Sequence, residues 1–324
     1  MTEPTTAGPD TTGELRAGAA RALEESASPT RLLWRRFRRH HLAMGSLVVL
    51  AVLALLSFAA PLVEAWTGLS ATRVDLMLRH AAPSLAHPLG TDELGRDLML
   101  RLLYGGRVSL MVGLVAALIS AIIGTVVGIA AGYYGGRFDA LLMRFTDGVI
   151  ALPLLPLLIV LAAVDFTKLG LPESVMTSES ASLYRMVILV SLVGWTTVAR
   201  LVRGATLSMK QREFVMAAQA LGAGNARIMW VHLLPNVASP IIVATTLSIG
   251  NIILLESVLS FLGLGIQPPM ASWGNMLTNA QELIYSNPML AVWPGLLIFV
   301  TVIAFNFLGD GLQDALDPRS GLQR

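Results

Sequence analysis

Long stretches without a charged residue constrain this chain more than any other feature of its sequence. They occupy residues 42–63, 108–136, 148–164, 186–199, 236–255 and 283–309. A run of about 20 apolar residues matches the thickness of a bilayer core, and in lipid only helices and closed barrels satisfy all their backbone groups. The sequence therefore predicts an all-α integral membrane protein with six transmembrane helices.

Two of these runs are irregular. The run 186–199 holds only 14 uncharged residues and would rise about 21 Å as a helix. We expect it to recruit flanking residues 182–185, or to let Arg200 extend its side chain to the lipid headgroups. The third run contains Pro153 and Pro156, which predict a kink whose freed carbonyls need neighbouring helices.

Small residues mark one face of the second run. Gly124, Gly128 and Gly132 recur every four residues. This spacing places all three glycines on one side of a helix, where they let a second helix approach closely. It predicts helix packing and carries no chemistry of its own.

The composition excludes several classes of function. The chain has 54% hydrophobic and 14% charged residues, whereas soluble domains have about 25% charged residues. It has no cysteine, which excludes disulfides, thiol catalysis and Cys-ligated zinc. Lys168 and Lys210 are its only lysines and neither follows the P-loop pattern. No His, Asp and Glu constellation lies within the runs, so we predict no enzyme and no cofactor or metal bound by this chain.

The distribution of positive charge predicts the orientation. Residues 1–30 lack apolar periodicity and are expected to form a disordered cytoplasmic tail. A basic collar of arginines between residues 31 and 39 precedes the first run and favours a cytoplasmic amino terminus. With six crossings both termini are cytoplasmic, including residues 320–324, and 16 of the 23 Lys and Arg residues fall inside. Arginines at the ends of apolar runs indicate membrane orientation, not binding to nucleic acid.

Residues 212–236 form a polar and alanine-rich interruption between the fourth and fifth runs. Phe214, Ala217, Ala218 and Leu221 recur with helical spacing and predict one apolar stripe on a short helix. Gly222 is expected to end this helix. The candidate cap of a second helix is Asn225, and Pro235 precedes the next membrane run.

The segment 87–97, between the first and second runs, has an unusual density of polar residues. Thr91 is a candidate helix N-cap, with Asp92 and Glu93 in the first turn, where acidic groups suit the helix dipole. Apolar residues and Arg101 on one side predict a helix lying on the outer membrane surface. The weaker alternative is a metal site formed by His87 with Asp92 or Asp97, although three ligands of fixed geometry are not evident.

Glu256 follows the fifth run directly and is costly if it faces lipid. It is either a gate or pathway residue, or a buried acid that hydrogen-bonds backbone near the end of its helix. Asn251 and Asn306 are further pathway candidates. Asp310, Asp314 and Asp317 near the carboxyl terminus favour a solvated helix exit over a cation site, since they lack the ligand alternation of a calcium loop.

Four motifs, which follow one another along the chain in the right order, resemble those of known permeases. Ala217-Ala218, Gly222 and Leu234-Pro235 resemble the coupling loop of ABC importer permeases, although Met216 replaces the usual glutamate and His232 a common isoleucine. Three further motifs resemble the dipeptide, oligopeptide and nickel importer permeases: residues 87–97, residues 256–274 and residues 305–319, the last with Gln313 where arginine is frequent. The resemblance covers residues 31–319.

The resemblance implies a type I ABC importer permease fold for residues 31–319 and the role of the C-type subunit in a heterodimeric permease pair. It further implies two ATPase subunits that bind ATP and Mg, an extracytoplasmic solute-binding protein and a bacterial inner membrane, with alternating access as the mechanism. The ATPase-coupling residues that it implies are Glu213, Phe214, Ala217, Ala218, Gly222, His232, Leu234 and Pro235. The external motif comprises His87, Gly90, Thr91, Asp92, Gly95, Arg96 and Asp97.

The resemblance does not select among peptides, nickel chelates, glutathione and some sugars as the solute. The main alternative is a secondary transporter or channel subunit that works without an ATPase and uses Glu256 and Asp147 as coupling groups. That class often carries an inverted repeat, and no convincing repeat relates the two halves of this sequence.

Overall fold

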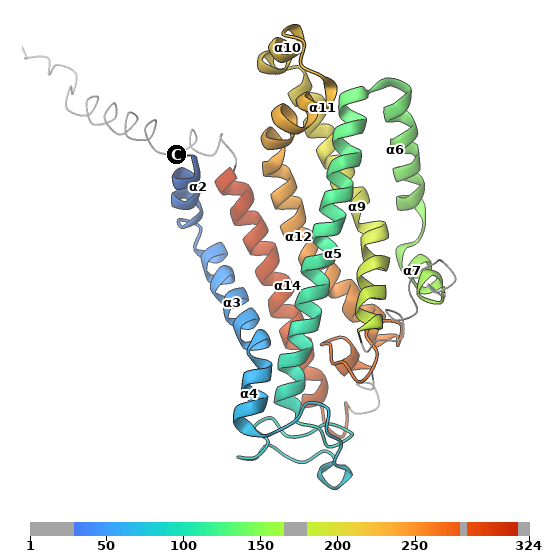
Figure 1. Cartoon of the computed structure of the whole chain (residues 1–324). Coiled ribbons are helices and arrows are strands. Elements are labelled where there is room, and N and C mark those ends of the chain that lie inside the picture. Colours follow the sequence, from blue (N-terminus) through green and yellow to red (C-terminus); the bar gives the residue numbers. More distant parts are fainter. Residues whose placement is uncertain (1–28, 165–179, 279–283, 317–324) are drawn as a thin grey trace, which may run out of the picture.

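The computed structural model describes residues 29–164, 180–278 and 284–316. Long helices run side by side and dominate this part of the chain (Figure 1), which contains no β-strand beyond an isolated bridge between Thr91 and Asp97. The all-α prediction is confirmed. The elements are α2 (Pro29–Phe37), α3 (His41–Phe58), α4 (Ala60–Thr67), η1 (Leu76–Leu78), α5 (Leu98–Tyr134), α6 (Gly136–Ala151), α7 (Leu154–Ala162), α9 (Ala181–Lys210), α10 (Glu213–Ala220), α11 (Asn225–Arg227), η3 (Ile228–Leu233), η4 (Leu234–Asn236), α12 (Ala238–Phe261), η5 (Asn275–Leu277) and α14 (Met289–Leu316).

Five of the described helices, α3, α5, α9, α12 and α14, are long and apolar enough to cross a membrane. The pair α6 and α7 becomes the sixth span if its two helices are counted together, and the two are bent by 87°. Pro153 caps the start of α7, so the predicted kink is a sharp break between two helices. The six-span prediction is thus supported if α6 and α7 are counted as one span, which the break between them interrupts.

The connection between the second and third spans is shorter than the sequence suggested. The uncharged runs 108–136 and 148–164 leave residues 137–147 between the two spans, but the chain turns at Gly135 and Gly136, whose φ angles are +68° and +57°. Helix α6 begins immediately at Gly136. The first turns of α6 carry charged side chains, so hydropathy did not assign them to the third span. In the structure, Asp139 Oδ1 of α6 lies 2.5 Å from Arg203 Nε of α9.

The fourth span extends beyond its short uncharged run in both directions. Helix α9 begins at Ala181 and reaches Lys210, so the expected recruitment of residues 182–185 is confirmed. Arg200 lies within the helix and contacts Asp147 of α6 at 2.5 Å. Ion pairs between α6 and α9 therefore accommodate these charged side chains within the two helices. Hydropathy, which treats each helix alone, places the same side chains at the ends of the spans.

The core is built around α5, which packs along α9 and also contacts α12 and α3. A Cβ atom added at Gly124, Gly128 or Gly132 would lie within about 3 Å of backbone atoms of α9. The predicted close packing by these glycines is confirmed. On another side of α5, Gly113 lies against Ile253 of α12.

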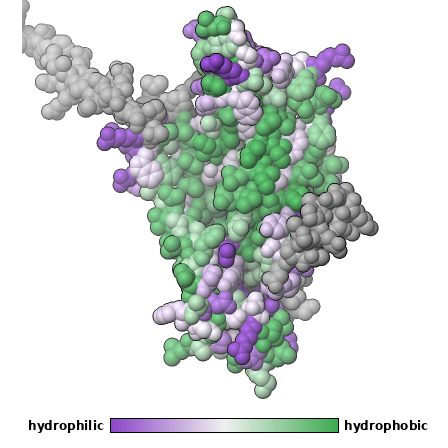
Figure 2. Space-filling model, viewed as in Figure 1, coloured by the Kyte–Doolittle hydropathy of each residue, from purple (hydrophilic) through white to green (hydrophobic). Residues whose placement is uncertain are grey.

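The two ends of the bundle differ. Helix α2, the turn from α5 to α6, helices α10 and α11 and the end of α14 lie at one end, whereas α4 and the following loop lie at the other (Figure 1). On the face that Figure 2 shows, hydrophobic residues cover the middle and hydrophilic residues gather toward both ends. Most of the predicted tail, residues 1–28, and the predicted end 320–324 lie outside the described residues, while Pro29 and Thr30 belong to α2.

Candidate functional site

Residues 212–236 project from one end of the bundle as a compact helical loop (Figure 1). Helix α10 starts at Glu213 and ends at Ala220. The Ala223 amide donates to the Ala218 carbonyl and the Gly222 amide donates to the Gln219 carbonyl, both at 3.0 Å. These two bonds, with φ of +82° at Gly222, form a Schellman motif. The prediction that Gly222 ends this helix is confirmed.

The second half of the loop differs from the expectation. Gly224 occupies the cap position of α11, and Asn225 is its first helical residue. The predicted cap is therefore wrong, because the Asn225 side chain has a tertiary partner: its Oδ1 accepts a hydrogen bond from the Tyr133 hydroxyl at 2.8 Å. The chain continues as the π-helix η3 and the short 3-10 helix η4, which contains Pro235.

Tyr133, at the end of α5, anchors the loop. Besides its bond to Asn225, its carbonyl accepts a hydrogen bond from Lys210 Nζ at 2.5 Å, and that ammonium lies 5.5 Å from the centre of the Tyr133 ring. Tyr133 also packs with the buried residues Val215, Ile228 and Leu233. The loop is therefore held against the helix at the centre of the bundle. Sequence analysis missed Tyr133, which falls at the end of an apolar run and carries no local signal.

The outward face of the loop is apolar. Phe214, Ala217 and Leu221 are exposed, with Leu221 at 88%. Ala218 is 9% exposed and faces the interior of the loop with Val215. The predicted single stripe is therefore divided between two faces. Positions i, i+3 and i+7 from Phe214 point outward, while Val215 and Ala218, three residues apart, point inward.

The remaining predicted coupling residues lie on the same loop. Glu213 and Pro235 are exposed, and His232 and Leu234 are half-buried. The His232 carbonyl accepts a hydrogen bond from Asn236 Nδ2 at 2.7 Å. The structure thus gathers all the predicted coupling residues at one end of the molecule, with Ala218 as the inward-facing member.

The external motif directly precedes α5 at the opposite end of the bundle. Thr91 does not cap a helix; its hydroxyl donates to the Leu78 carbonyl and accepts from the Ala81 amide. Asp97 is the cap instead, and its Oδ1 accepts from the Leu100 amide at 2.8 Å. The expected surface helix from residue 91 is therefore wrong. Glycines at positive φ interrupt the segment, so regular helix begins only at Leu98.

The ionisable groups of this motif contact one another. Asp92 Oδ2 lies 2.7 Å from Arg96 Nε and 3.1 Å from Arg101 Nε, and His87 Nδ1 lies 3.0 Å from Asp97 Oδ2. The described residues contain no group of three His, Asp or Glu side chains that could hold a metal ion. A Cβ atom at Gly95 would collide with the Asp75 carbonyl oxygen. The motif therefore positions the loop that follows α4 on the amino end of α5.

Glu256 is fully buried in α12. Its carboxyl group accepts hydrogen bonds from the hydroxyls of Ser109 at 3.1 Å and Ser260 at 2.7 Å. Ser109 also accepts from the Trp273 amide, and Ser260 accepts from the Ile266 amide. Glu256 is therefore buried, as the second of the two alternatives has it, but its partners are serine hydroxyls and not the backbone. Through these serines it supports the segment that follows α12.

The other two pathway candidates differ from Glu256 in exposure. Asn251 of α12 and Asn306 of α14 have exposed side chains, so the structure does not bring the three residues into one polar site. Asp310 and Asp314 are exposed at the end of α14, in agreement with the solvated helix exit, while Asp317 lies outside the described residues.

A bundle of apolar helices long enough to cross a membrane, with an anchored loop at one end, defines a polytopic membrane protein. Comparison with known families makes this specific. Residues 124–321 match the family of binding-protein-dependent transport system inner membrane components, and residues 28–83 match the N-terminal transmembrane domain of oligopeptide transport permease C. The chain belongs to the first of these families, and it is a permease subunit of an ATP-driven ABC importer with the type I fold.

Curated relatives match nearly the whole chain. The dipeptide transport system permease protein DppC of Alkalihalophilus pseudofirmus is 39% identical over 91% of each chain. The glutathione transport system permease protein GsiD of Escherichia coli O6:K15:H31 is 40% identical over 91% of this chain and 92% of its own. The oligopeptide transport system permease protein OppC of Haemophilus influenzae is 38% identical over 92% of both. This family membership favours an importer permease over a secondary transporter or channel.

Proposed function

We propose that this chain is one half of a heterodimeric permease pair that imports peptides or related small solutes across a bacterial inner membrane. The names of its relatives support this solute class. In the proposed assembly two ATPase subunits bind ATP and Mg in the cytoplasm, and an extracytoplasmic solute-binding protein delivers the solute. Both termini and the loop 212–236 then lie in the cytoplasm, in agreement with the excess of Arg and Lys in these segments.

The observation that carries the proposal is the exposed apolar face formed by Phe214, Ala217 and Leu221 on an anchored loop. A large apolar side chain that is 88% exposed, such as Leu221, gains stability when a partner covers it. Complete burial of a leucine contributes about 1.5–3 kcal/mol. The alanine between the two larger side chains leaves room for close approach of an ATPase surface.

The anchor supplies a route for motion. When the ATPase pair closes on ATP, it displaces α10, and the Tyr133 contacts with Asn225 and Lys210 transmit that displacement to α5. Because α5 packs against α9 through backbone contacts at its glycines, the two helices move together. The loop biases the permease between its two access states because the docked ATPase contacts it differently in each state.

Aspartate substitutions on the outward face test the proposal. Ala217→Asp and Leu221→Asp place a charge in the proposed ATPase contact without altering the interior of the loop. For Leu221→Asp, loss of about 1.5–3 kcal/mol of docking energy corresponds to a roughly 10- to 150-fold weaker ATPase contact. We expect normal membrane insertion but a comparable loss of ATP-driven uptake in proteoliposomes.

A matched control separates docking from general charge effects. Gln313→Asp adds a carboxylate to an exposed position of α14 at the same end of the molecule and is expected to leave uptake unchanged. Ala218→Asp is a less specific test because Ala218 is buried within the loop, where a carboxylate would also disrupt folding. Normal uptake by both outward-face variants would contradict the proposal.

A further inference from the structure

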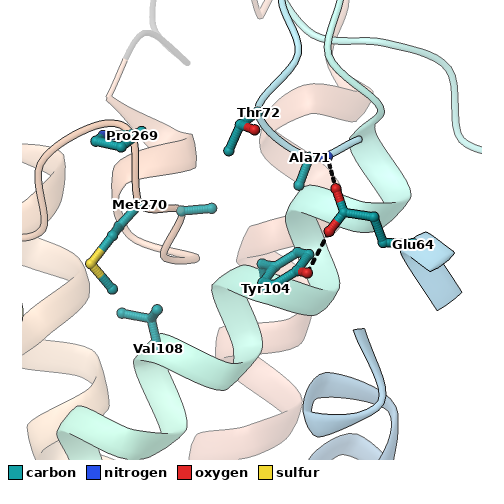
Figure 3. A pocket seen from close by; sticks show the side chains of 8 residues that line it. Glu64, Ala71, Thr72, Tyr104, Val108, Pro269 and Met270 are labelled. Carbon is teal, nitrogen blue, oxygen red and sulfur yellow. Dashed lines mark hydrogen bonds between the residues drawn. The ribbon is translucent and has the colours of Figure 1, made fainter. Parts of the chain in front are cut away.

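A cavity of about 240 Å³ lies at the end of the molecule opposite the loop 212–236. Figure 3 shows that its wall combines residues from α4, the loop after α4, α5 and the segment that follows α12. None of the predicted pathway, coupling or external-motif residues lines it. The lining residues are Glu64, Ala71, Thr72, Tyr104, Val108, Pro269, Met270 and Ala271.

Glu64 is the acidic member of this wall. Its Oε2 accepts a hydrogen bond from the Tyr104 hydroxyl at 2.5 Å, and its Oε1 accepts one from the Ala71 amide at 3.3 Å. Both donors are neutral. Within the described ranges, no Lys, Arg or His side chain forms a salt bridge with Glu64, because every ion pair found there involves another acid. Arg107, one turn along α5 from Tyr104, lies over the Phe58 ring, and its charge acts on Tyr104 through space without an ion pair to Glu64.

This arrangement around Glu64 favours the binding of a cation. Glu64 is half-buried, and a carboxylate withdrawn from water is stabilised when a positive group meets it. Two hydrogen bonds fix the direction of the carboxylate, yet each oxygen retains capacity to accept a further bond. A compact ammonium needs only a point contact of this kind, whereas a guanidinium binds best to a free two-oxygen edge.

The rest of the wall sets the size and polarity of the ligand. Val108, Pro269 and Met270 supply an apolar surface opposite Glu64 (Figure 3), and Ala271 also lines the cavity. The methionine can adjust its shape to a bound alkyl group. A volume of about 240 Å³ is below the roughly 300–1,000 Å³ of pockets that hold drug-sized ligands. The cavity therefore suits one end of a solute or a single side chain, not an entire oligopeptide.

We propose that this cavity is a binding site for a primary ammonium group carried on a short apolar stem, with Glu64 as the group that receives the charge. The ammonium contacts the Glu64 carboxylate and the stem lies against Val108 and Met270. Two sources can present this chemistry: the amino end of a solute in transit, and a lysine of the protein that delivers it. The ammonium site itself does not depend on the proposed role of the loop 212–236.

A direct titration tests the site without requiring transport. The probe is n-butylammonium, added to the purified permease complex in nanodiscs whose lipid, phosphatidylcholine, carries no primary amine. Binding is followed by isothermal calorimetry. We expect saturable binding of n-butylammonium and at least tenfold weaker binding of n-butanol and n-butyrate. Glu64→Gln is expected to weaken n-butylammonium binding at least tenfold, because it removes the charge while keeping the shape.

Two further variants make the test specific. Glu93→Gln removes a negative charge on the same end of the molecule but outside the cavity, and is expected to leave binding within twofold of the unmodified protein. Tyr104→Phe removes one neutral donor from Glu64 and is expected to preserve or strengthen binding. Undiminished binding in Glu64→Gln, equal loss in Glu93→Gln, or equal binding of n-butanol would each overturn the proposal.

Competition then distinguishes the two sources of the ammonium group. Displacement of n-butylammonium by the dipeptide Ala-Phe but not by its N-acetylated form assigns the site to a solute. Displacement only by the solute-free cognate binding protein assigns it to a docking lysine. Equal displacement by Ala-Phe and its N-acetylated form contradicts an ammonium site. A failed titration alongside the expected loss of uptake in Leu221→Asp would reject this site and leave the proposed function standing.

Discussion

Substitution of Gly128 by alanine tests the packing on which transmission through α5 depends. A Cβ atom at this position would lie 2.6 Å from the Ala199 carbonyl oxygen, 2.8 Å from Val202 Cβ and 3.0 Å from the Arg203 amide nitrogen. Carbon atoms pack best at about 3.5–4.0 Å, so α9 has to move away by roughly 0.7–1.2 Å at the Val202 contact. Two of the three atoms belong to the backbone, so a rotamer change cannot relieve the clash.

The expected cost follows from overpacking. Extra atoms forced into a well-packed core usually cost about 1–3 kcal/mol, and we expect Gly128→Ala to lower the free energy of unfolding by this amount. Gly204→Ala is the matched control: this glycine lies on α9 itself, and an added Cβ atom would meet nothing within 4 Å. Replacement of glycine by alanine within a helix, without a clash, is neutral or stabilises by about 0.5–1 kcal/mol.

The measurement is the free energy of unfolding of the purified subunit, obtained by titrating mixed micelles with SDS and following helix content by circular dichroism. The reasoning predicts that Gly128→Ala unfolds at a lower SDS fraction than the unmodified protein and that Gly204→Ala does not. A Gly128→Ala variant as stable as the Gly204→Ala variant would refute the close contact between α5 and α9.

Two further predictions concern the end of the molecule opposite the loop 212–236. Trp273→Phe removes the indole hydrogen bond to the Leu102 carbonyl, which measures 2.9 Å, and is expected to cost about 0.5–1.5 kcal/mol of unfolding free energy in the same SDS titration; an unchanged midpoint would contradict it. Asp97→Ala removes the cap of α5 at Leu100 and the contact with His87, and is expected to cost about 0.5–2 kcal/mol, with faster amide hydrogen exchange confined to the first turn of α5. Exchange rates there equal to those of the unmodified protein would show that Asp97 is not the cap.

Local features of the sequence were sufficient for the class of fold and for the position of the loop 212–236. Apolar runs as long as a bilayer is thick can form only a few structures in lipid, and the Gly222 stop follows from the freedom of glycine at positive φ. The boundaries of the third span were not predicted correctly. Hydropathy rejected the charged first turns of α6, whose Asp139 is paired with Arg203 on α9.

For the sites, too, the sequence predicted some features and the tertiary structure was needed for others. The motif resemblance selected the residues of the loop, but the sequence did not reveal that Ala217 faces outward while Ala218 packs inward with Val215. Thr91 and Asp97 both belong to the residue types that cap helices, and tertiary contacts with residues 78–81 engage Thr91 elsewhere. The cavity beside Glu64 gave no sequence signal, because its wall joins residues more than 200 positions apart.

The sequence by itself determined that this chain crosses a membrane as helices, where its polar loops fall and which loop has the composition of a docking surface, because hydropathy, charge and turn chemistry act over a few residues. Only the tertiary structure decided which side chains meet: Tyr133 with Asn225, Ser109 with Glu256, and Tyr104 with Glu64. These pairs are 40 to 147 positions apart along the chain. Their formation depends on how the helices pack against one another, and periodicity within a single segment does not contain that information.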